Sequence, residues 1–359
     1  MDPRRRRDPA KSHRKISQSV RHFPCARQPL IDVKIRLLGH YFLSAASLVD
    51  SYVYDFVRFC RHSQMVGKTR SKIRARANLM LAAHALEKGL ALPEPRPGFG
   101  VTKCFELLDE SVRFHQRYGP DSILGYVEDV FASMIAFHRE DEKPYQRLTA
   151  KLASCSSIFT GAERSWTRRG GLIKTTREQI VAAAPPDPFE FFNQRHSVRE
   201  FSREPVALEH LKRAAQIAQL APSVCNRQAG RIHYSMDPRK IERILACQRG
   251  NLGFGDRAPV ACIITAEIGV FNKPGERNQQ FIDGGLFAMT FALGLHSLGL
   301  GACFLNWSVT AQEDRKLRAS IDLPTSETVV VVMVIGNLKP EFVVAASPRQ
   351  PLADVLSAI

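Results

Sequence analysis

The sequence lacks the cysteine pattern of a disulfide-bonded or metal-stabilised protein. Its eight cysteines are scattered among 359 residues, no two of them form a Cys-x-x-Cys pair, and no cysteines and histidines complete a four-ligand metal set. Long apolar runs are also missing, because the longest weakly polar stretch near the start, residues 37–49, falls well short of the ~20 residues of a membrane-spanning helix. We therefore expect a cytoplasmic protein in a reducing compartment, with no metal site and no transmembrane segment.

Acidic residues are scarce at the N-terminus. The formal charge of the chain is +16 at pH 7, and residues 1–36 contain eleven Lys and Arg against three Asp, a net charge of +8. A run such as Arg4-Arg5-Arg6-Arg7 repels itself and stays extended until it meets an anionic partner. We expect a disordered basic tail over 1–36, with nucleic acid, anionic lipid or an acidic protein as candidate partners. An organellar transit peptide is the alternative.

Apolar residues that recur at three- and four-residue steps predict a helical N-terminal half. The pattern indicates helices over 37–66, 70–91, 102–117 and 121–139. No strand pattern precedes residue 180. We place a helical extension at 37–150 and a linker at 151–186, because the latter stretch is polar, contains several Ser and Gly residues and ends in Pro185-Pro186-Asp187-Pro188.

Helices and apolar strands alternate after residue 188. Strands are predicted at 231–235, 259–266, 302–306 and 327–336. Helices are predicted at 207–220, 238–248, 281–298 and 311–319. The continuous β-branched run at 329–335 is typical of a strand that is buried on both faces of a sheet. These patterns predict a layered α/β or α+β domain over 187–359.

Three polar segments of this domain carry candidate binding groups. Arg195 and Arg199 lie on a loop with Ser197 between them, and such a set of donors suits a phosphate or a flavin carbonyl, although a solvated loop has the same composition. In Ala221-Pro222-Ser223-Val224-Cys225-Asn226-Arg227-Gln228 the proline ends a helix, and the amides that follow suit a planar heterocycle; an ordinary capping turn is the alternative. Near the end, Arg349 is held between two prolines.

Glycines mark both ends of the predicted helix at 281–298. Asp283-Gly284-Gly285 opens an apolar segment with small residues, which suits close helix packing and a dimer core. Gly299-Leu300-Gly301 permits a tight turn from this helix into the next strand. It is not a dinucleotide-binding fingerprint, because it leaves a helix and does not open one after a strand.

The order and spacing of these segments resemble the nitroreductase family of FMN flavoproteins over roughly residues 187–355. The resemblance implies an α+β fold: a three-layer α/β/α domain with a central mixed sheet, here preceded by an all-α extension. It implies a homodimer that binds FMN between its subunits. It also implies an oxidoreductase that transfers a hydride from NADH or NADPH to a small organic acceptor, by ping-pong kinetics.

The resemblance also assigns cofactor contacts residue by residue. It implies that one group of residues contacts the FMN phosphate, ribityl chain and pyrimidine edge: Arg195, His196, Ser197 and Arg199. It implies that a second group contacts the flavin, usually across the dimer interface: Pro222, Ser223, Asn226 and Gln228. It implies phosphate binding by Arg349 and a ribityl-side contact by Asn251. No side chain is assigned as a nucleophile or general base.

Two departures from the family pattern leave the substrate open. Gln228 is followed by Ala229-Gly230, where the family commonly has Pro-Trp, and Ser347 stands where a Lys is often found. The reaction could be reduction of a nitro-aromatic or a quinone, reductive dehalogenation, dehydrogenation of a peptide-derived azoline, or reduction of an enoyl or keto group on a sugar precursor. A flavin-binding module without turnover, serving as an interaction platform for an anionic partner, is the alternative function. His84 and Glu87, three residues apart on one helix, are either an acid/base pair or a surface pair.

Overall fold

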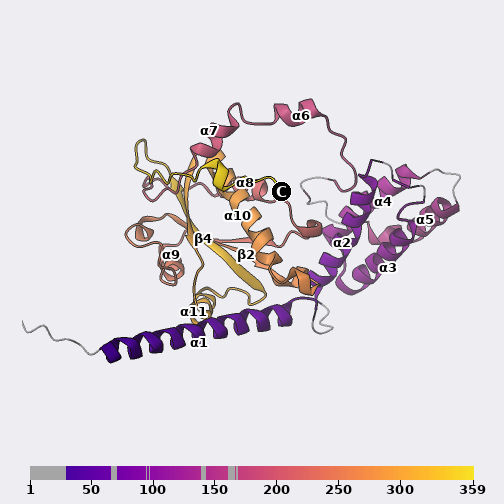
Figure 1. Cartoon of the computed structure of the whole chain (residues 1–359). Coiled ribbons are helices and arrows are strands. Elements are labelled where there is room, and N and C mark those ends of the chain that lie inside the picture. Colours follow the sequence, from indigo (N-terminus) through magenta and orange to yellow (C-terminus); the bar gives the residue numbers. More distant parts are fainter. Residues whose placement is uncertain are drawn as a thin grey trace, which may run out of the picture. The chain divides into compact units, whose positions relative to one another are not determined.

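The computed structural model of this chain describes residues 30–65, 71–93, 95–96, 98–138, 143–160, 166 and 169–359 (Figure 1). The chain divides into two units, residues 1–49 and residues 50–359. Most of the predicted basic tail lies outside the described residues. Helix α1 (Leu30–His62) begins seven residues before the predicted start of the helical extension and passes from the first unit into the second.

Four helices near the start of the second unit form a bundle, here called the helical unit. They are α2 (Lys72–Leu90), α3 (Val101–Tyr118), α4 (Ser122–Phe137) and α5 (Lys143–Ser154). The first three confirm the predicted helices, whereas α5 was not predicted. Side-chain caps fix the residues at which two of these helices begin. At the start of α2 the Ser71 hydroxyl accepts a hydrogen bond from Arg74 N at 3.3 Å, and at the start of α4 the Asp121 carboxylate accepts one from Ile123 N at 3.0 Å.

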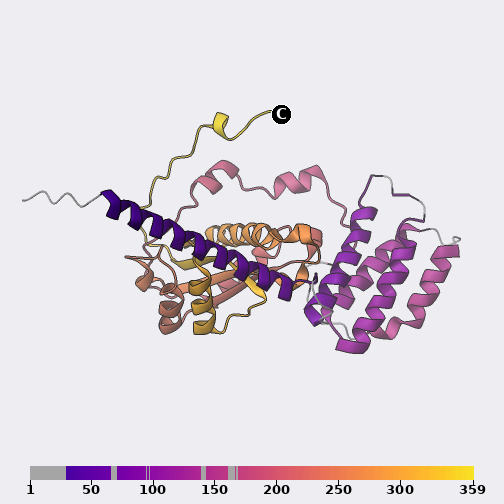
Figure 2. The same ribbon diagram turned by 60° about the horizontal axis from the view of Figure 1, so that its bottom comes forward.

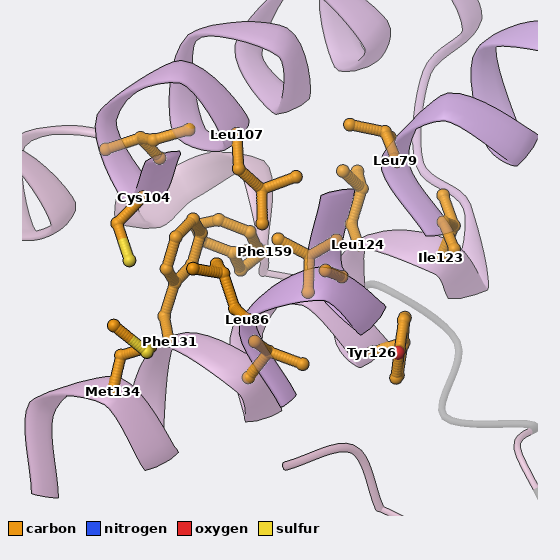
Figure 3. Packing of buried hydrophobic residues seen from close by; sticks show 14 of the residues in the cluster. Leu79, Leu86, Cys104, Leu107, Ile123, Leu124, Tyr126, Phe131, Met134 and Phe159 are labelled. Atoms are coloured by element: carbon orange, nitrogen blue, oxygen red, sulfur yellow. The ribbon is translucent and has the colours of Figure 1, made fainter. Parts of the chain in front are cut away.

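The core of the helical unit is apolar and closely packed (Figure 3). Leu86, Leu124 and Phe131 are almost completely buried. Ile158 and Phe159, which follow α5 near a 3₁₀ turn at Ser156–Ile158, are buried in the same core. Part of the stretch that the sequence suggests as a linker therefore packs with the helices. The described residues before 180 contain no strand.

A four-stranded sheet organises the C-terminal half. Its strands are β1 (Gly230–Ser235), β2 (Val260–Glu267), β3 (Leu300–Asn306) and β4 (Glu327–Asn337), in the order β1-β2-β4-β3. All four predicted strands are confirmed. These strands pair antiparallel throughout, so the predicted mixed sheet needs correction: the parallel pairing among the described residues is an isolated bridge between Ser197 and Ala302. Apolar runs locate strands but do not fix their direction, which depends on the path of each connection.

Helices cover both faces of the sheet. Helices α8 (Leu208–Ala218) and α10 (Gln279–Ser297) share one core cluster with it. Helices α9 (Pro238–Leu245) and α11 (Ala311–Ile321) share the other. Figure 2 shows α10, in orange, along one side of the sheet, with α9 and α11 opposite. The predicted α+β class with three layers is therefore confirmed.

Connecting segments and short helices complete the second unit. Helices α6 (Arg177–Ala182) and α7 (Pro188–Asn193) lie in an exposed connection before the sheet. Short 3₁₀ helices lie at Val224–Asn226, Gly255–Arg257, Ile268–Val270, Pro274–Glu276 and Leu352–Asp354. The last part of α1 is tied to the layered domain, because the Tyr54 hydroxyl donates to Asp314 at 2.7 Å and Arg58 donates to the Glu327 carbonyl at 2.6 Å. Among the described helices, none has the length and apolar character needed to cross a membrane.

Candidate functional site

Five of the predicted site residues line one cavity of about 430 Å³, here called the arginine cavity. Four come from the loop at the start of the layered domain and one comes from the C-terminal segment: Arg195, His196, Ser197, Arg199 and Arg349. Phe189 and Phe192 add aromatic walls. Among the described residues that line this cavity, none is acidic. Three guanidinium groups without a carboxylate make it suited to a phosphate or another anion.

The edge of the sheet positions the loop of the arginine cavity. Val198 N donates to the Ala302 carbonyl at 3.0 Å, and the Val198 side chain is buried in the core beneath. A Cβ on Gly301 would lie 3.0 Å from Val198 Cγ1 and 2.8 Å from Leu338 Cδ2. The glycine of the predicted helix-to-strand turn therefore allows the loop to approach β3 closely.

Two arginines of the cavity act electrostatically on the buried thiol of Cys303. Burial raises the pKa of the Cys303 thiol, and the positive charges of Arg199 and Arg195, with a hydrogen bond to Ser197, act in the opposite direction. Both guanidinium groups therefore lie close enough to the Cys303 thiol to influence its pKa. The Arg349 side chain is oriented by its own C-terminal segment. Its guanidinium group donates to the Ser347 carbonyl, and Ser347 has a left-handed φ of 45°.

Three other predicted residues line a second cavity of about 520 Å³, here called the loop cavity. They are Pro222, Ser223 and Gln228, and the aromatic side chain of Phe287 also lines this cavity. The arginine cavity and the loop cavity have no lining residue in common. Within one chain, the two predicted groups of cofactor contacts are therefore not brought into one cavity.

The loop of the second cavity has an unusual backbone. Cys225, Asn226 and Gln228 have φ values of 49°, 52° and 51°, in the left-handed region that residues other than glycine seldom adopt. Each such conformation costs on the order of 1–3 kcal/mol and persists only where surrounding contacts hold it. Strain of this kind is concentrated at functional sites, so the backbone marks this loop independently of its sequence.

Contacts from within the domain hold the strained loop. The Ser223 hydroxyl accepts a hydrogen bond from Gln228 N at 3.0 Å. The buried Asp283 carboxylate accepts one from Val224 N at 3.2 Å, and burial raises the pKa of this carboxyl group. Sequence reasoning noted Asp283 only as part of a helix start. Its partner is 59 residues away, so no local signal could have indicated this contact.

The helical unit also contacts the loop, which the sequence did not indicate. Gln228 Nε2 donates to Asn226 Oδ1 at 3.2 Å and lies 4.0 Å from Met80 Sδ on α2. The Asn226 side chain lies near the Tyr126 hydroxyl of α4, because it acts on the pKa of that phenol. The Tyr126 hydroxyl donates to Glu87 at 2.6 Å. Asn226 and Gln228 are therefore positioned from the side of the extension as well as by their own domain.

Asn251 and the His84–Glu87 pair lie apart from both cavities. Asn251 is buried, and its amide nitrogen donates to the carbonyls of Leu245 at 2.7 Å and Gln248 at 3.2 Å. Its ribityl-side role stays a prediction. The Glu87 carboxylate lies 3.4 Å from His84 Nδ1 and also accepts a hydrogen bond from Gly171 N at 2.7 Å. Glu87 thus bridges several segments of the second unit.

Comparisons with known proteins identify the layered domain. Residues 193–248 and 236–337 match the model of the Nitroreductase family. An FMN-dependent nitroreductase from Clostridium difficile R20291 is 23% identical, over 44% of this chain and 91% of that one, with a TM-score of 0.39. A structure described as a nitroreductase in complex with FMN, from Desulfovibrio desulfuricans, is 20% identical, over 49% and 98% of the two chains, with a TM-score of 0.42. Residues 193–337 of this chain therefore form a domain of the Nitroreductase family, which follows an N-terminal helical unit.

Proposed function

We propose that this chain is an FMN-dependent oxidoreductase of the nitroreductase type. The observation that carries the proposal is the meeting of Arg195, Arg199 and Arg349 in one cavity that no described acidic residue lines. Residues from the two ends of a domain converge there, more than 140 positions apart in the sequence. A doubly charged phosphate is the kind of ligand that makes such a concentration of guanidinium groups favourable.

The donor chemistry of the site fits FMN. In this proposal the three arginines hold the phosphate, while His196 and Ser197 supply donors and acceptors for the ribityl hydroxyls. Pro222, Ser223, Asn226 and Gln228 contact the ring system. Asn251 remains a candidate on the ribityl side.

The separation of the two cavities supports a homodimer. In this proposal a single FMN is held by both groups of residues through two copies of the chain, each contributing one group. Helix α10 offers an apolar face for such an assembly, because Phe281, Ile282 and Leu286 have between 44% and 54% of their surface exposed. Exposed apolar side chains gathered on one helix are typical of an interaction surface.

FMN, when bound, supplies hydride transfer from NADH or NADPH to a small organic acceptor. The chain supplies binding and electrostatics. Arg199 is our candidate for the cation that stabilises negative charge at the pyrimidine edge. The strained loop presents fixed amide groups, so little reorganisation is needed when charge develops nearby. A cytoplasmic location, based on the scattered cysteines, belongs to the same proposal.

The test is an absorbance spectrum of the purified dimer with its flavin. We expect bands near ~450 nm that bleach when NADH or NADPH is added without oxygen. Arg195→Ala and Arg349→Ala should each lower flavin occupancy, whereas Arg239→Ala, on the exposed side of α9, should leave it unchanged. A folded protein that takes up no FMN would refute the proposal. Bound flavin that no nicotinamide reduces would instead support a binding module without turnover.

A further inference from the structure

A third cavity, of about 320 Å³, lies where the helical unit meets the nitroreductase domain, and we call it the junction cavity. Arg76, Met80 and Trp166 line it from the helical side, and Gln219, Gln228 and Arg231 line it from the domain. We propose that the junction cavity binds the electron acceptor and selects a flat apolar molecule that carries an anionic group. This inference rests on the proposed function, because it names the substrate class of that same site.

The junction cavity adjoins the loop that is proposed to contact the flavin. Gln219, Gln228 and Arg231 line both the junction cavity and the loop cavity. Gln228 belongs to the strained loop itself. A molecule in the junction cavity therefore lies beside residues of the redox site, and the helical unit forms its other wall.

Three arginines, Arg76, Arg227 and Arg231, are among the described residues that line the junction cavity, and no acidic residue is. Lys72 and Arg76 share one carboxylate, that of Asp121. Arg227 is paired with Glu276. Arg231 forms no ion pair with a carboxylate among the described residues, although its charge acts on the carboxyl groups of Glu267 and Glu327. A lining with three guanidinium groups and no described carboxylate favours an anionic ligand.

Arg231 is held at the cavity edge by the main chain. Its Nη1 atom donates to the carbonyls of Gln228 at 2.8 Å and Gly230 at 2.7 Å. These contacts fix the guanidinium group without neutralising it. A guanidinium group that is preorganised and free of a carboxylate can bind an anion with a smaller loss of side-chain entropy than a free side chain.

An aromatic wall favours a flat ligand. The Trp166 indole donates to the Ser122 carbonyl at 2.6 Å, and its ring lies 5.5 Å from the Tyr126 ring. The Arg76 guanidinium lies 5.6 Å from the Trp166 ring. Met80 adds a polarisable apolar surface nearby. Held on several sides, the indole offers a rigid surface on which a planar molecule can stack.

Two probes that differ only in charge test the proposal: 4-nitrobenzoate and its neutral methyl ester. In one turnover NAD(P)H and a proton convert the nitro group to a nitroso group, with release of NAD(P)⁺ and water. Arg231→Gln should raise KM for 4-nitrobenzoate on the order of tenfold, the loss of one charge-assisted hydrogen bond. KM for the ester should change by less than about twofold. Arg231→Lys should recover part of the loss, and Arg239→Gln should resemble wild type.

Binding without turnover separates this inference from the proposed function. Calorimetric titration with 2-naphthoate needs no electron transfer, and we expect wild type to bind it and Arg231→Gln to bind it more weakly. Should the purified protein hold no flavin, the proposed function fails, and Arg231-dependent naphthoate binding would still support an anion-selective cavity. Equal loss of both nitro substrates in Arg231→Gln, or naphthoate binding that does not depend on Arg231, would overturn the inference.

Discussion

Replacing Gly301 with Ala perturbs the arginine cavity through a single added methyl group. That Cβ would lie 3.0 Å from both Val198 Cβ and Val198 Cγ1, closer than side chains normally pack, and 2.8 Å from Leu338 Cδ2. The end of a leucine side chain can rotate away. The Val198 Cβ is attached directly to the backbone, so relief at that contact requires the loop to move, and Ser197 and Arg199 move with it.

The size of the effect follows from the cost of overpacking, about 1–3 kcal/mol. If about 1 kcal/mol of this cost weakens the binding geometry of the loop that lines the arginine cavity, the proposed affinity for FMN falls about fivefold. Gly299→Ala is a matched control two residues away. Gly299 has a φ of 74° and open space around it, so alanine there costs about 1–2 kcal/mol of backbone strain without touching Val198.

Two measurements separate the variants. Thermal unfolding should show that both lose stability by a similar amount. Titration with FMN, followed by quenching of flavin fluorescence, should show weaker binding for Gly301→Ala alone. Equal FMN affinity in the two variants would show that the close approach of β3 and the loop does not position the cofactor contacts.

Two other substitutions test the contacts around the strained loop and the sheet. Tyr126→Phe removes the hydroxyl that lies between Asn226 and Glu87. We expect FMN affinity to fall between about twofold and tenfold, as for the loss of one hydrogen bond. An unchanged FMN affinity would show that the helical unit does not support the loop. Burial favours a higher pKa for Glu327, but its hydrogen bonds with His233 and Thr265, together with the nearby positive charges of His233 and Arg231, outweigh burial and hold the pKa below its usual value of 4.5. Its contribution to stability is therefore present above that pH and is lost as the pH falls through the lower folded-state pKa, so Glu327→Gln should flatten the acid limb of the unfolding curve.

Local sequence patterns were sufficient to predict the helices and strands but not how these elements pack together. The four strands and most of the helices could be predicted to within a few residues, because apolar periodicity is read over short windows. The stretch after residue 150 was harder. Its apolar residues are too sparse to show a period, yet Ile158 and Phe159 each enter the core of the helical unit. A single large side chain can anchor a polar segment without leaving a pattern.

The candidate site residues were predicted from composition and order, and the structure adds geometry that composition could not give. Arg195 and Arg349 share a cavity, and the loop of Arg195 is held there by the hydrogen bond from Val198 N to the Ala302 carbonyl, far away in the sequence. The sequence could not indicate the left-handed conformations of Cys225, Asn226 and Gln228, because none of these residues is a glycine. Such conformations depend on contacts from residues far away in the sequence, and only the folded chain contains those contacts.

The helical unit contributes to the candidate site through its contacts with the strained loop. Three left-handed residues together cost several kcal/mol, which Ser223 and Asp283 offset through hydrogen bonds to the loop backbone. Those two bonds act on the main chain. The side chains of Asn226 and Gln228 are hydrogen-bonded to each other, and their further contacts come from α2 and α4. The domain thus fixes the backbone of the loop, and the extension supports its amide groups, so a change in α2 or α4 should alter which acceptor is used before it alters whether the domain folds.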